Sequence, residues 1–586
     1  MQVDPQRIVD GFTDLSGGMD SGRSPMLATS ANPNGLLPNQ TAFNVNCRAR
    51  GGRIKPRPGW TRRVLNFDGN PQLEQDFKTG IFQHANAYYP ANSPPFIMAS
   101  IGGAIFRVML GNYLVQEVTK PTDRNPKNRL QAWMYQADRF LIIQDGQSRP
   151  FIFDGSELRR SDPTKNEIQT GTVGIFAQGR IWYALPNGTT FRATDLIYGN
   201  GNASDVLRET ENDFLNEGGD FGTAGFTVPS NAAQITAMRQ LANLDVALGQ
   251  GPILVFTPNM IFSLNAPVDR TLWKDLQYPI QTVSLINYGA LSQNSTVSVN
   301  GDFFYRSIDG VRSFVLARRD FQTWGNTPVS TEVEQVLAND STEYLGYSSA
   351  VLFDNRLIMT CSPVFTARGV VHRGLAVLDF QSISGITRKA PPAWDGMWVG
   401  LNILQILKVH YSGKDRCFMF AQNSSGEIEL WELSEEDRFD NGNERISWAF
   451  ETASYPFQNP FEQKKLWAGD TWIDRAAGEC EINMRYRPDQ HPCWLQWHTC
   501  RWCAEYCWTP SDDPLKCKTP KEYKEQYRPR LGFPQPEDVC NAIAGMPPYR
   551  LGYQFQFRFE CVGFFEVIQG RFITHRIQEA PFNPCC

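Results

Sequence analysis

The chain has 586 residues, a length typical of two to four domains. Its 41% hydrophobic and 12% aromatic residues can fill large buried cores, which argues against wholesale disorder. A formal net charge of −5 argues against a protein that binds nucleic acid over its whole surface, since such proteins carry a basic stripe. The frequent aromatic residues, interspersed with 47 Gly and 38 Pro, favour an all-β protein.

Residues 1–64 are predicted to form an extended N-terminal arm. Between Leu15 and Trp60, Gly and Pro are too frequent for a helix and recur too regularly for a disordered tail. Gly17–Gly18 offers a turn with positive φ, and apolar residues alternate with polar ones in Phe43–Cys47, as in a short strand. Gly51–Gly52 predicts a hairpin-type turn before the chain enters a β-domain. The opening MQVDPQRIVDGF lacks the pattern of a signal peptide, and no apolar window predicts a transmembrane helix.

The end of the arm carries a basic cluster. Seven Lys and Arg residues and no acidic residue occur between Arg48 and Arg63. One hypothesis is a contact with DNA or with an acidic partner subunit, and the alternative is a turn that is solvated or faces an interface. The candidates for the contact are Arg48, Arg50, Arg53, Lys55 and Arg57.

Residues 65–450 repeat one loose unit of two β-rich runs joined by a Gly, Asp-Gly or Asn-Gly turn. The unit recurs about every 40 to 60 residues, which is the size of a propeller blade. Two clear examples are RFLIIQDGQSRPFIFDG and GDFFYRSIDGVRSFVLA. The repeats predict a β-propeller of six to eight blades, because a closed radial array hides its strand edges. A pair of β-sandwiches is the alternative.

Two segments interrupt these repeats. Asp195–Phe226 is polar and acidic, and we interpret it as a long loop. A calcium site there is the alternative, although the acidic spacing fits no EF-hand. Ser330–Leu345 is the best helix candidate, with Val333 and Val336 on an apolar stripe that would pack against a blade.

Residues 451–586 are predicted to form a C-terminal β-sandwich with a Cys- and Trp-rich insertion at about 488–548. In YQFQFRFECVGFFEVIQGRFITHRI, aromatic residues alternate with Gln and Arg. Tyr553, Phe555 and Phe557 should therefore share one face of a strand.

Ten of the 13 cysteines lie in the last 107 residues, and we favour disulfides that staple a loop-rich insertion. The disulfide candidates are Cys480, Cys493, Cys500, Cys503, Cys507, Cys517, Cys540 and Cys561. A structural zinc site is the alternative, in which Cys493, Cys507 or His498 would complete the half-site Cys500-x-x-Cys503. A redox CxxC site would require a βαβ context that the sequence lacks. The pair Cys585–Cys586 either bridges to a neighbouring subunit or carries free thiols.

No catalytic motif is present. The six histidines are scattered, and neither HExxH, GxSxG nor GxxxxGK[ST] occurs. Paired carboxylates for glycoside hydrolysis can come from distant strands, but the one hint, Asp470 near Trp472, fits a solvated strand end better. We therefore predict no catalytic residue and, apart from the zinc alternative, no cofactor.

The arm resembles the N-terminal arm of the tail nozzle (tail tubular protein B) of short-tailed bacteriophages and of related head-to-tail stabilising proteins. The motif covers under a tenth of the chain, and the C-terminal ending resembles the closing domain of the same proteins. The matching residues are Leu15, Gly17, Gly18, Pro25, Pro38, Gln40, Asn44, Gly52, Arg57 and Pro58.

This resemblance implies a structural protein of the virion. Copies would form a homo-oligomeric ring, commonly a hexamer, below the portal and adaptor, and DNA would pass through its centre during ejection. The Cys-rich insertion departs from the nozzle pattern. Two alternatives therefore stay open: a receptor-binding or fibre-anchoring module of a phage, and a polysaccharide-degrading enzyme.

Overall fold

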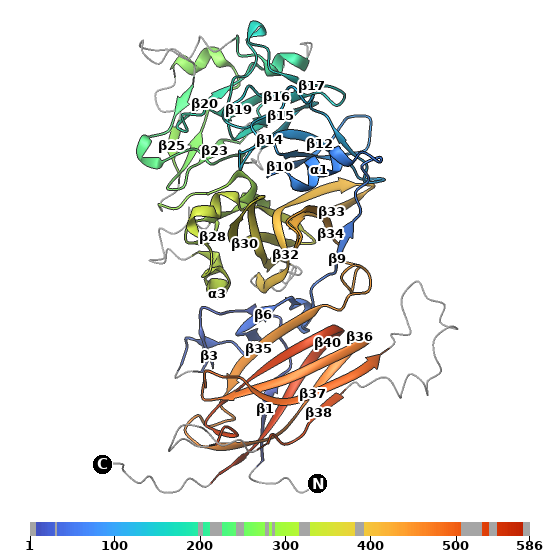
Figure 1. Cartoon of the computed structure of the whole chain (residues 1–586). Helices are drawn as coiled ribbons and strands as arrows, with labels where there is room; N and C mark the ends of the chain where they lie inside the picture. The colour runs from blue at the N-terminus through green and yellow to red at the C-terminus, as the bar shows by residue number, and fades with distance from the viewer. Residues whose placement is uncertain are drawn as a thin grey trace.

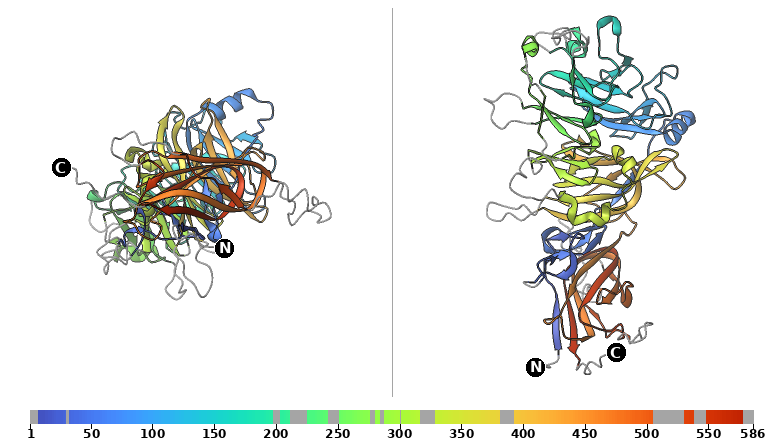
Figure 2. Two further views of the ribbon diagram at one scale, coloured as in Figure 1. Left: turned by 90° about the horizontal axis from the view of Figure 1, so that it is seen from below. Right: turned by 90° about the vertical axis from the view of Figure 1, so that its left-hand side faces the viewer.

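The computed structural model describes residues 7–29, 32–196, 203–210, 225–241, 251–275, 280–283, 287–299, 301–315, 328–380, 392–504, 530–537 and 548–577. They form two β-rich bodies stacked end to end in an elongated molecule (Figure 1). We call the upper one the propeller and the lower one the C-terminal sandwich. The side view shows the same stacking (Figure 2, right).

Five separate antiparallel sheets form five blades of the propeller in chain order. The first two blades are β10 (Phe82–Tyr88), β11 (Phe96–Ile101), β12 (Ala104–Met109) and β13 (Val115–Glu117), then β14 (Trp133–Ala137), β15 (Phe140–Gln144), β16 (Phe151–Phe153) and β17 (Leu158–Arg160). The next two are β18 (Gly174–Ala177), β19 (Arg180–Ala184), β20 (Thr190–Ala193) and β21 (Phe226–Thr227), then β22 (Ala237–Gln240), β23 (Ile253–Phe256), β24 (Ile261–Leu264) and β25 (Ile280–Thr282). The fifth is β26 (Val297–Val299), β27 (Asp302–Ser307) and β28 (Gly310–Ser313).

The blades form because short apolar runs alternate with tight turns. Gly102 and Gly103, with φ of +58° and +79°, join β11 to β12 in the left-handed turn geometry that glycine adopts without strain. The apolar side chains then pack between successive blades. Phe96 and Met98 of the first blade, for example, share one core cluster with Leu141 of the second.

The remaining arc of the propeller is closed by longer strands, so the prediction of six to eight separate blades is wrong in number. These strands are β29 (Ala350–Phe353), β30 (Arg356–Thr366), β31 (Gly369–Asp379), β32 (Ala393–Tyr411), β33 (Lys414–Gln422), β34 (Ile428–Leu433) and β9 (Trp60–Arg63). Strand β32 pairs with β31 along one half and with β33 along the other, which fuses units that would otherwise be separate blades. The β-propeller itself is confirmed, and a pair of sandwiches in this region is excluded.

The helix predicted over Ser330–Leu345 is broken into short turns: η9 (Val329–Val333), α3 (Glu334–Leu337) and η10 (Thr342–Tyr347). Asp340 lies between α3 and η10, and its carboxylate pairs with Arg306 at 2.6 Å. Val333 and Val336 are buried against the propeller, as predicted. The longest helix among the described residues is instead α1 (Pro71–Thr79), which is capped by Asn70.

Much of the predicted loop Asp195–Phe226, with its calcium alternative, lies outside the described residues. Glu209 at its described edge is buried and pairs with Arg192 at 3.3 Å.

The C-terminal sandwich is built on two long, bent strands. Its strands are β35 (Ser447–Tyr455), β36 (Lys464–Pro488), β37 (Leu495–Ala504), β38 (Arg530–Phe533), β39 (Leu551–Gly552) and β40 (Phe555–Arg576). One half of β40 pairs with β35 and the other with β1 (Arg7–Phe12). Bends in β36 and β40 bring their halves face to face, so that Phe557 stacks on Phe572 with ring centroids 3.6 Å apart. Phe555, Phe557 and Phe559 are fully buried along β40, as predicted, whereas Tyr553 precedes the strand and is 38% exposed.

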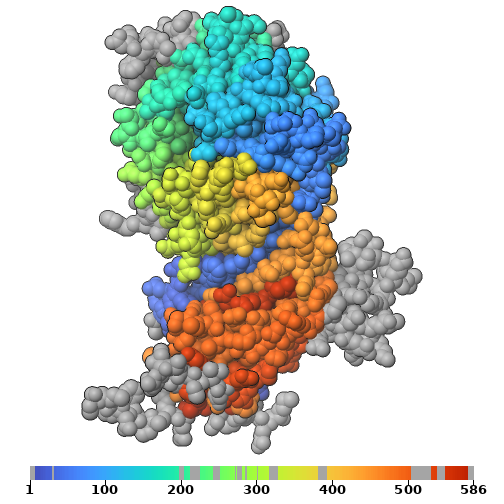
Figure 3. All heavy atoms as spheres, viewed as in Figure 1, coloured from blue at the N-terminus to red at the C-terminus, as the bar shows by residue number. Residues whose placement is uncertain are grey.

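The N-terminal arm runs from the sandwich to the propeller and adds strands to both. After β1 it forms β2 (Gly18–Met19), β3 (Ser24–Leu27), β4 (Gly35–Leu36), β5 (Gln40–Thr41), β6 (Phe43–Val45), β7 (Cys47–Arg48) and β8 (Lys55–Pro56). Strand β6 pairs with β35 of the sandwich and bridges to β32 of the propeller. In the space-filling view, the blue arm separates the yellow propeller from the orange sandwich (Figure 3). Its strands therefore complete sheets of its own chain.

Candidate functional site

The basic cluster of the arm lies at the junction of the two bodies, and each of its members pairs with a carboxylate of the same chain. The pairs are Arg48 with Glu435, Arg50 with Asp354 and Asp379, Arg53 with Asp474 and Glu566, Lys55 with Glu566, Arg57 with Asp440, Arg62 with Glu429, and Arg63 with Glu432. Arg48, Arg50, Arg53, Lys55 and Arg57 therefore have ion-pair partners within the chain, and their contact with DNA or a partner subunit stays a prediction. These carboxylate partners could not be predicted from the sequence, because each lies more than 300 residues further along the chain than its basic residue. Arg50 and Asp354, for example, are 304 residues apart.

Arg356 is the centre of a buried ion network beneath this cluster. Its guanidinium, 1% exposed, lies 2.6 Å from Asp354, 3.3 Å from Asp379, 3.1 Å from Asp395 and 2.9 Å from Glu435. Burial, opposed by the charge of Arg356, raises the pKa of Asp395 to about 6. Since the Arg50 guanidinium binds two of the same carboxylates, the arm and the propeller share one set of charges.

The arm residues that resemble the nozzle motif hold this junction together. Gly18 has φ of +68°, and a Cβ there would lie 2.5 Å from the carbonyl oxygen of Trp394. The amide of Gln40 donates to buried Asp20 at 3.4 Å, and Asn44 is fully buried on β6. Arg57 binds Asp440 with two nitrogens, at 2.8 and 2.7 Å. The motif is therefore a set of close-packing and pairing positions.

Among the described cysteines of the C-terminal region, the disulfide prediction fails at two positions. Cys493 and Cys561 carry free thiols. Cys561 is buried among the aromatic side chains of the sandwich, and burial raises the pKa of its thiol. The buried thiol of Cys480 donates a weak hydrogen bond to the carbonyl oxygen of Phe564 at 3.5 Å. Both side chains therefore lie in the core of the sandwich, and the free Cys561 does not staple the insertion.

The backbone of β37 does not have the turn that the predicted zinc half-site requires. Cys500 and Cys503 lie on the continuous strand β37, whereas a CxxC zinc half-site needs a turn that brings both sulphurs to one point. Cys507, Cys517, Cys540, Cys585 and Cys586 lie outside the described residues. Within the described ranges, no group of three or more His, Cys, Asp or Glu side chains is placed to hold a metal ion.

The propeller axis contains a pocket of about 390 Å³. It is lined from β10, β14, β18, β22, β29, β32 and the turn η8 (Gln293–Ser295). Asn294 on η8 and His84 on β10 form a hydrogen bond of 3.1 Å between side chains from non-adjacent parts of the ring. Burial lowers the pKa of His84 to about 3, so its imidazole is neutral.

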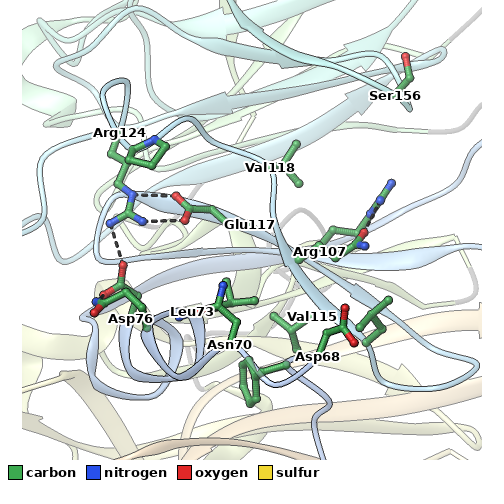
Figure 4. A pocket seen from close by; sticks show the side chains of 15 residues that line it. Asp68, Asn70, Leu73, Asp76, Arg107, Val115, Glu117, Val118, Arg124 and Ser156 are labelled. Atoms are coloured by element: carbon green, nitrogen blue, oxygen red, sulfur yellow. Dashed lines mark hydrogen bonds and ion pairs between the residues drawn. The ribbon is translucent and has the colours of Figure 1, made fainter.

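A second depression of about 770 Å³ lies on the outer side of the first blade, between α1 and β13 (Figure 4). Arg124 binds Glu117 with two nitrogens, at 2.7 and 2.6 Å, and pairs with Asp76 at 2.9 Å. Arg107 on the same wall donates to Gln116. The charges of Arg124, Glu117 and Asp76 therefore compensate one another, whereas the partner of Arg107 is a neutral amide.

The hint of a carboxylate next to Trp472 also has a structural explanation. Asp470 is buried and pairs with Arg530 and Arg571, whose guanidinium groups lie 5.0 and 5.5 Å from the ring of Trp472. Two charge-assisted pairs hold this carboxylate in place between neighbouring strands.

Comparisons with known proteins show only distant similarities. No family model and no curated protein matches the sequence. Similar solved structures include BamB from Moraxella catarrhalis, with 10% identity over 64% of this chain and 98% of that chain and a TM-score of 0.31. Sqt1 from Saccharomyces cerevisiae shares 9% identity over 64% of this chain and 100% of that chain, with a TM-score of 0.35. Similarities at this level carry no inference about function.

No helix within the described parts of the chain is long and apolar enough to span a membrane. The residues at the axis, His84, Arg239 and Asn294, had no local signal in the sequence. They come from three different parts of the ring, and only its closure brings them together.

Proposed function

We propose that this protein is a structural component of a bacteriophage tail, a nozzle-like subunit of a ring that conducts DNA below the portal and adaptor. The observation that carries the proposal is the position of the nozzle-like arm motif. Its residues form the joint that fixes the propeller on the sandwich, through β6 and the ion pairs of the basic cluster. An arm motif whose residues hold the two bodies together fits a family with a mechanical role.

Rigidity supports the same proposal. A strand of the arm lies between two bodies that could otherwise hinge, and Arg50 of the arm shares Asp354 and Asp379 of the propeller with buried Arg356. Relative motion is the default for domains joined by small interfaces. A subunit in the wall of a tube has to transmit force along its length, which this double attachment allows.

The proposed DNA passage lies between copies, because the propeller axis is too small. The axial pocket has about 390 Å³ and is crossed by the hydrogen bond between His84 and Asn294. Each copy carries a net charge of −5, and a wall of like charge repels DNA phosphates and lets the duplex slide.

The test is the assembly state of the purified full chain. We expect native mass spectrometry and electron cryomicroscopy to show a closed ring, commonly of six copies, alone or on a portal–adaptor complex, and no release of reducing sugars from bacterial polysaccharide. A monomer at every concentration that also fails to bind a portal–adaptor complex would contradict the proposal. Turnover of polysaccharide would favour the enzyme alternative.

Exposed aromatic side chains at one end of the sandwich favour a second candidate function, receptor binding or fibre anchoring. Phe461 is 85% exposed, Trp467 43% and Tyr553 38%. Lys464 is fully buried, and its amine donates to the backbone carbonyl oxygen of Tyr553 at 3.1 Å. Binding of labelled protein to host cells that is lost in F461A/W467A, and kept in a V64A control on the arm, would support this candidate.

A further inference from the structure

The axial pocket of the propeller contains a cation without a counter-ion. Arg239 on β22 lines the pocket, and its guanidinium has no carboxylate partner among the described residues. Three hydrogen bonds hold it: to Thr296 Oγ1 at 2.8 Å, to the carbonyl oxygen of Gln293 at 2.7 Å and to that of Thr296 at 3.1 Å. Burial lowers the pKa of Arg239 to about 10, so the group is still charged at neutral pH.

These three bonds leave part of the guanidinium available. They use Nε and Nη2, whereas Nη1 has no partner in the described part of the chain and is not closed off from solvent. Arg239 is partly buried, and a guanidinium that has lost much of its water is costly unless an anion compensates its charge. The contacts to η8 explain how the side chain is held in position, and they leave its charge unbalanced.

His84 adds a second donor to the same pocket. The amide nitrogen of Asn294 can only donate, so Nδ1 of His84 accepts this hydrogen bond and the proton of the neutral ring lies on Nε2. The Nε2–H group has no protein partner among the described residues. The pocket therefore presents a charged donor and a neutral donor from opposite parts of the ring.

The rest of the lining excludes cations and admits a small anion. None of the described residues that line the pocket is acidic. Its other cation, Lys408, is exposed and already pairs with Asp415 at 3.1 Å. Gln405 and Gln293 use their amides on backbone groups of β10 and β22, which fixes the walls. A volume of about 390 Å³ is at the lower end for ligand pockets and suits a molecule of monosaccharide size.

We propose that the propeller axis binds a small oxyanion, a carboxylate or a phosphate group, through Arg239 and His84. The guanidinium supplies the charge and Nη1 donors, and the Nε2–H of His84 binds another oxygen of the same group. A charge-assisted hydrogen bond from a guanidinium nitrogen to an oxyanion is short and strong, and Nη1 can offer such a bond here. The proposed anion site does not depend on the proposed ring of subunits, and a separate experiment tests it.

The test titrates the full-length protein by calorimetry with inorganic phosphate, glucuronate and glucose at constant ionic strength. We expect phosphate, glucuronate or both to bind and glucose not to bind. Binding of phosphate alone identifies a phosphoryl ligand, and binding of glucuronate alone identifies a carboxylated sugar. Binding of neither anion, or equal binding of glucose, overturns the proposal.

Two variants locate the site. Arg239→Gln should weaken binding about tenfold or more, since it removes a charge-assisted contact. Asn294→Asp leaves Arg239 in place and adds a negative charge beside it, so it should also abolish binding, and it keeps the test decisive if Arg239→Gln does not fold. Arg107→Gln, in the outer depression, is the matched control and should bind as the unchanged protein does. Unchanged affinity in folded Arg239→Gln or Asn294→Asp overturns the assignment.

Discussion

Arg57 shows how single side chains hold the arm in place. Its guanidinium is 3% exposed, binds Asp440 with two nitrogens and stacks 3.6 Å above the ring of buried Trp60. Its Nε also donates to Asn46 at 3.2 Å. One side chain therefore connects the arm to the last strand region of the propeller by a charge pair, a cation–π contact and an amide contact.

Replacing Arg57 by Ala should lower the free energy of unfolding by about 3 kcal/mol, because Asp440 loses its partner in a largely buried place. Urea denaturation followed by circular dichroism measures this. The control is Arg62→Ala, whose side chain is 53% exposed and pairs with Glu429, and we expect a loss under about 1 kcal/mol. Equal losses for the two variants would contradict the role given to Arg57.

Glu332 gives a pH dependence to the contact between the arm and η9. Its backbone oxygen accepts from the amide of Ser21 at 2.6 Å. Burial, and then the charge of Asp20, raise the pKa of Glu332 to about 7, and Arg23 only partly opposes this shift. A carboxyl whose pKa is raised on folding stabilises the fold below its unfolded pKa, and that contribution is lost as the pH rises through 7.

Glu332→Gln should therefore gain stability relative to the unchanged protein as the pH rises. We expect no difference near pH 4 and an advantage of about 1 to 2 kcal/mol at pH 8, less than the full shift because the group is partly solvated. Urea denaturation at a series of pH values gives the difference curve. A difference that stays constant from pH 4 to 8 would sink the assignment.

At the scale of elements, the N-terminal strand β1 completes the sandwich. Phe12 is 2% exposed and contacts Phe450, Phe559 and Phe572, with ring centroids 6.0 to 6.5 Å apart. Its neighbour Val9 on the same strand is 45% exposed. The inward positions of β1 thus seal the aromatic core between β35 and β40.

Phe12→Ala should lower the free energy of unfolding by about 3 to 4 kcal/mol, the cost of a cavity in an aromatic core. Val9→Ala, on the same strand, should cost under about 0.5 kcal/mol. Chemical denaturation of both variants is the measurement. If Phe12→Ala behaves like Val9→Ala, β1 is not docked in solution as the structure has it.

The crossing of β2 over β32 depends on glycine for two separate reasons. Gly18 has positive φ and lies against the carbonyl oxygen of Trp394. Gly51, outside this crossing, serves as the control. It has φ of +75°, and an added Cβ would have no neighbouring atom within 4 Å, so a substitution there tests only the strain of the backbone conformation. Gly51→Ala should cost about 1 kcal/mol, and Gly18→Ala about 2 kcal/mol or more beyond that, because the two strands must separate. Equal costs in thermal denaturation would remove the close approach as a factor.

At the scale of the whole molecule, the arm makes two bodies into one cooperative unit. The sandwich cannot separate from the propeller without breaking β6 pairing and the ion pairs of Arg48 and Arg50. Buried Asp379 and Asp395 would then be left with fewer counter-charges. Loss of the arm contact should therefore uncouple the two bodies.

We expect a single calorimetric unfolding transition in the unchanged protein and two in Arg48→Ala/Arg50→Ala, in which the propeller unfolds at lower temperature. Lys414→Ala is the control, since its side chain is 78% exposed and pairs with equally exposed Glu436. Two transitions in the unchanged protein, or one in the double variant, would show that the bodies are not coupled through these residues.

Local patterns in the chain were enough to predict the local features of this protein. The alternation around Phe555 and Phe557, the turn at Gly102–Gly103 and the extended arm all follow from steric and burial rules that act over a few residues. The class of fold followed from their repetition. The number of blades depended on strand pairing in space, because β32 fuses units that look separate in the sequence.

The candidate sites likewise emerged only from the folded chain. The basic residues of the arm suggested an external partner, whereas their carboxylates come from strands hundreds of residues away, and the spacing Cys500-x-x-Cys503 lies on an extended strand. Arg239, His84 and Asn294 meet only where the ring closes. Charge pairing and enclosure depend on distance in space, and the order of residues along a chain does not encode that distance between remote segments.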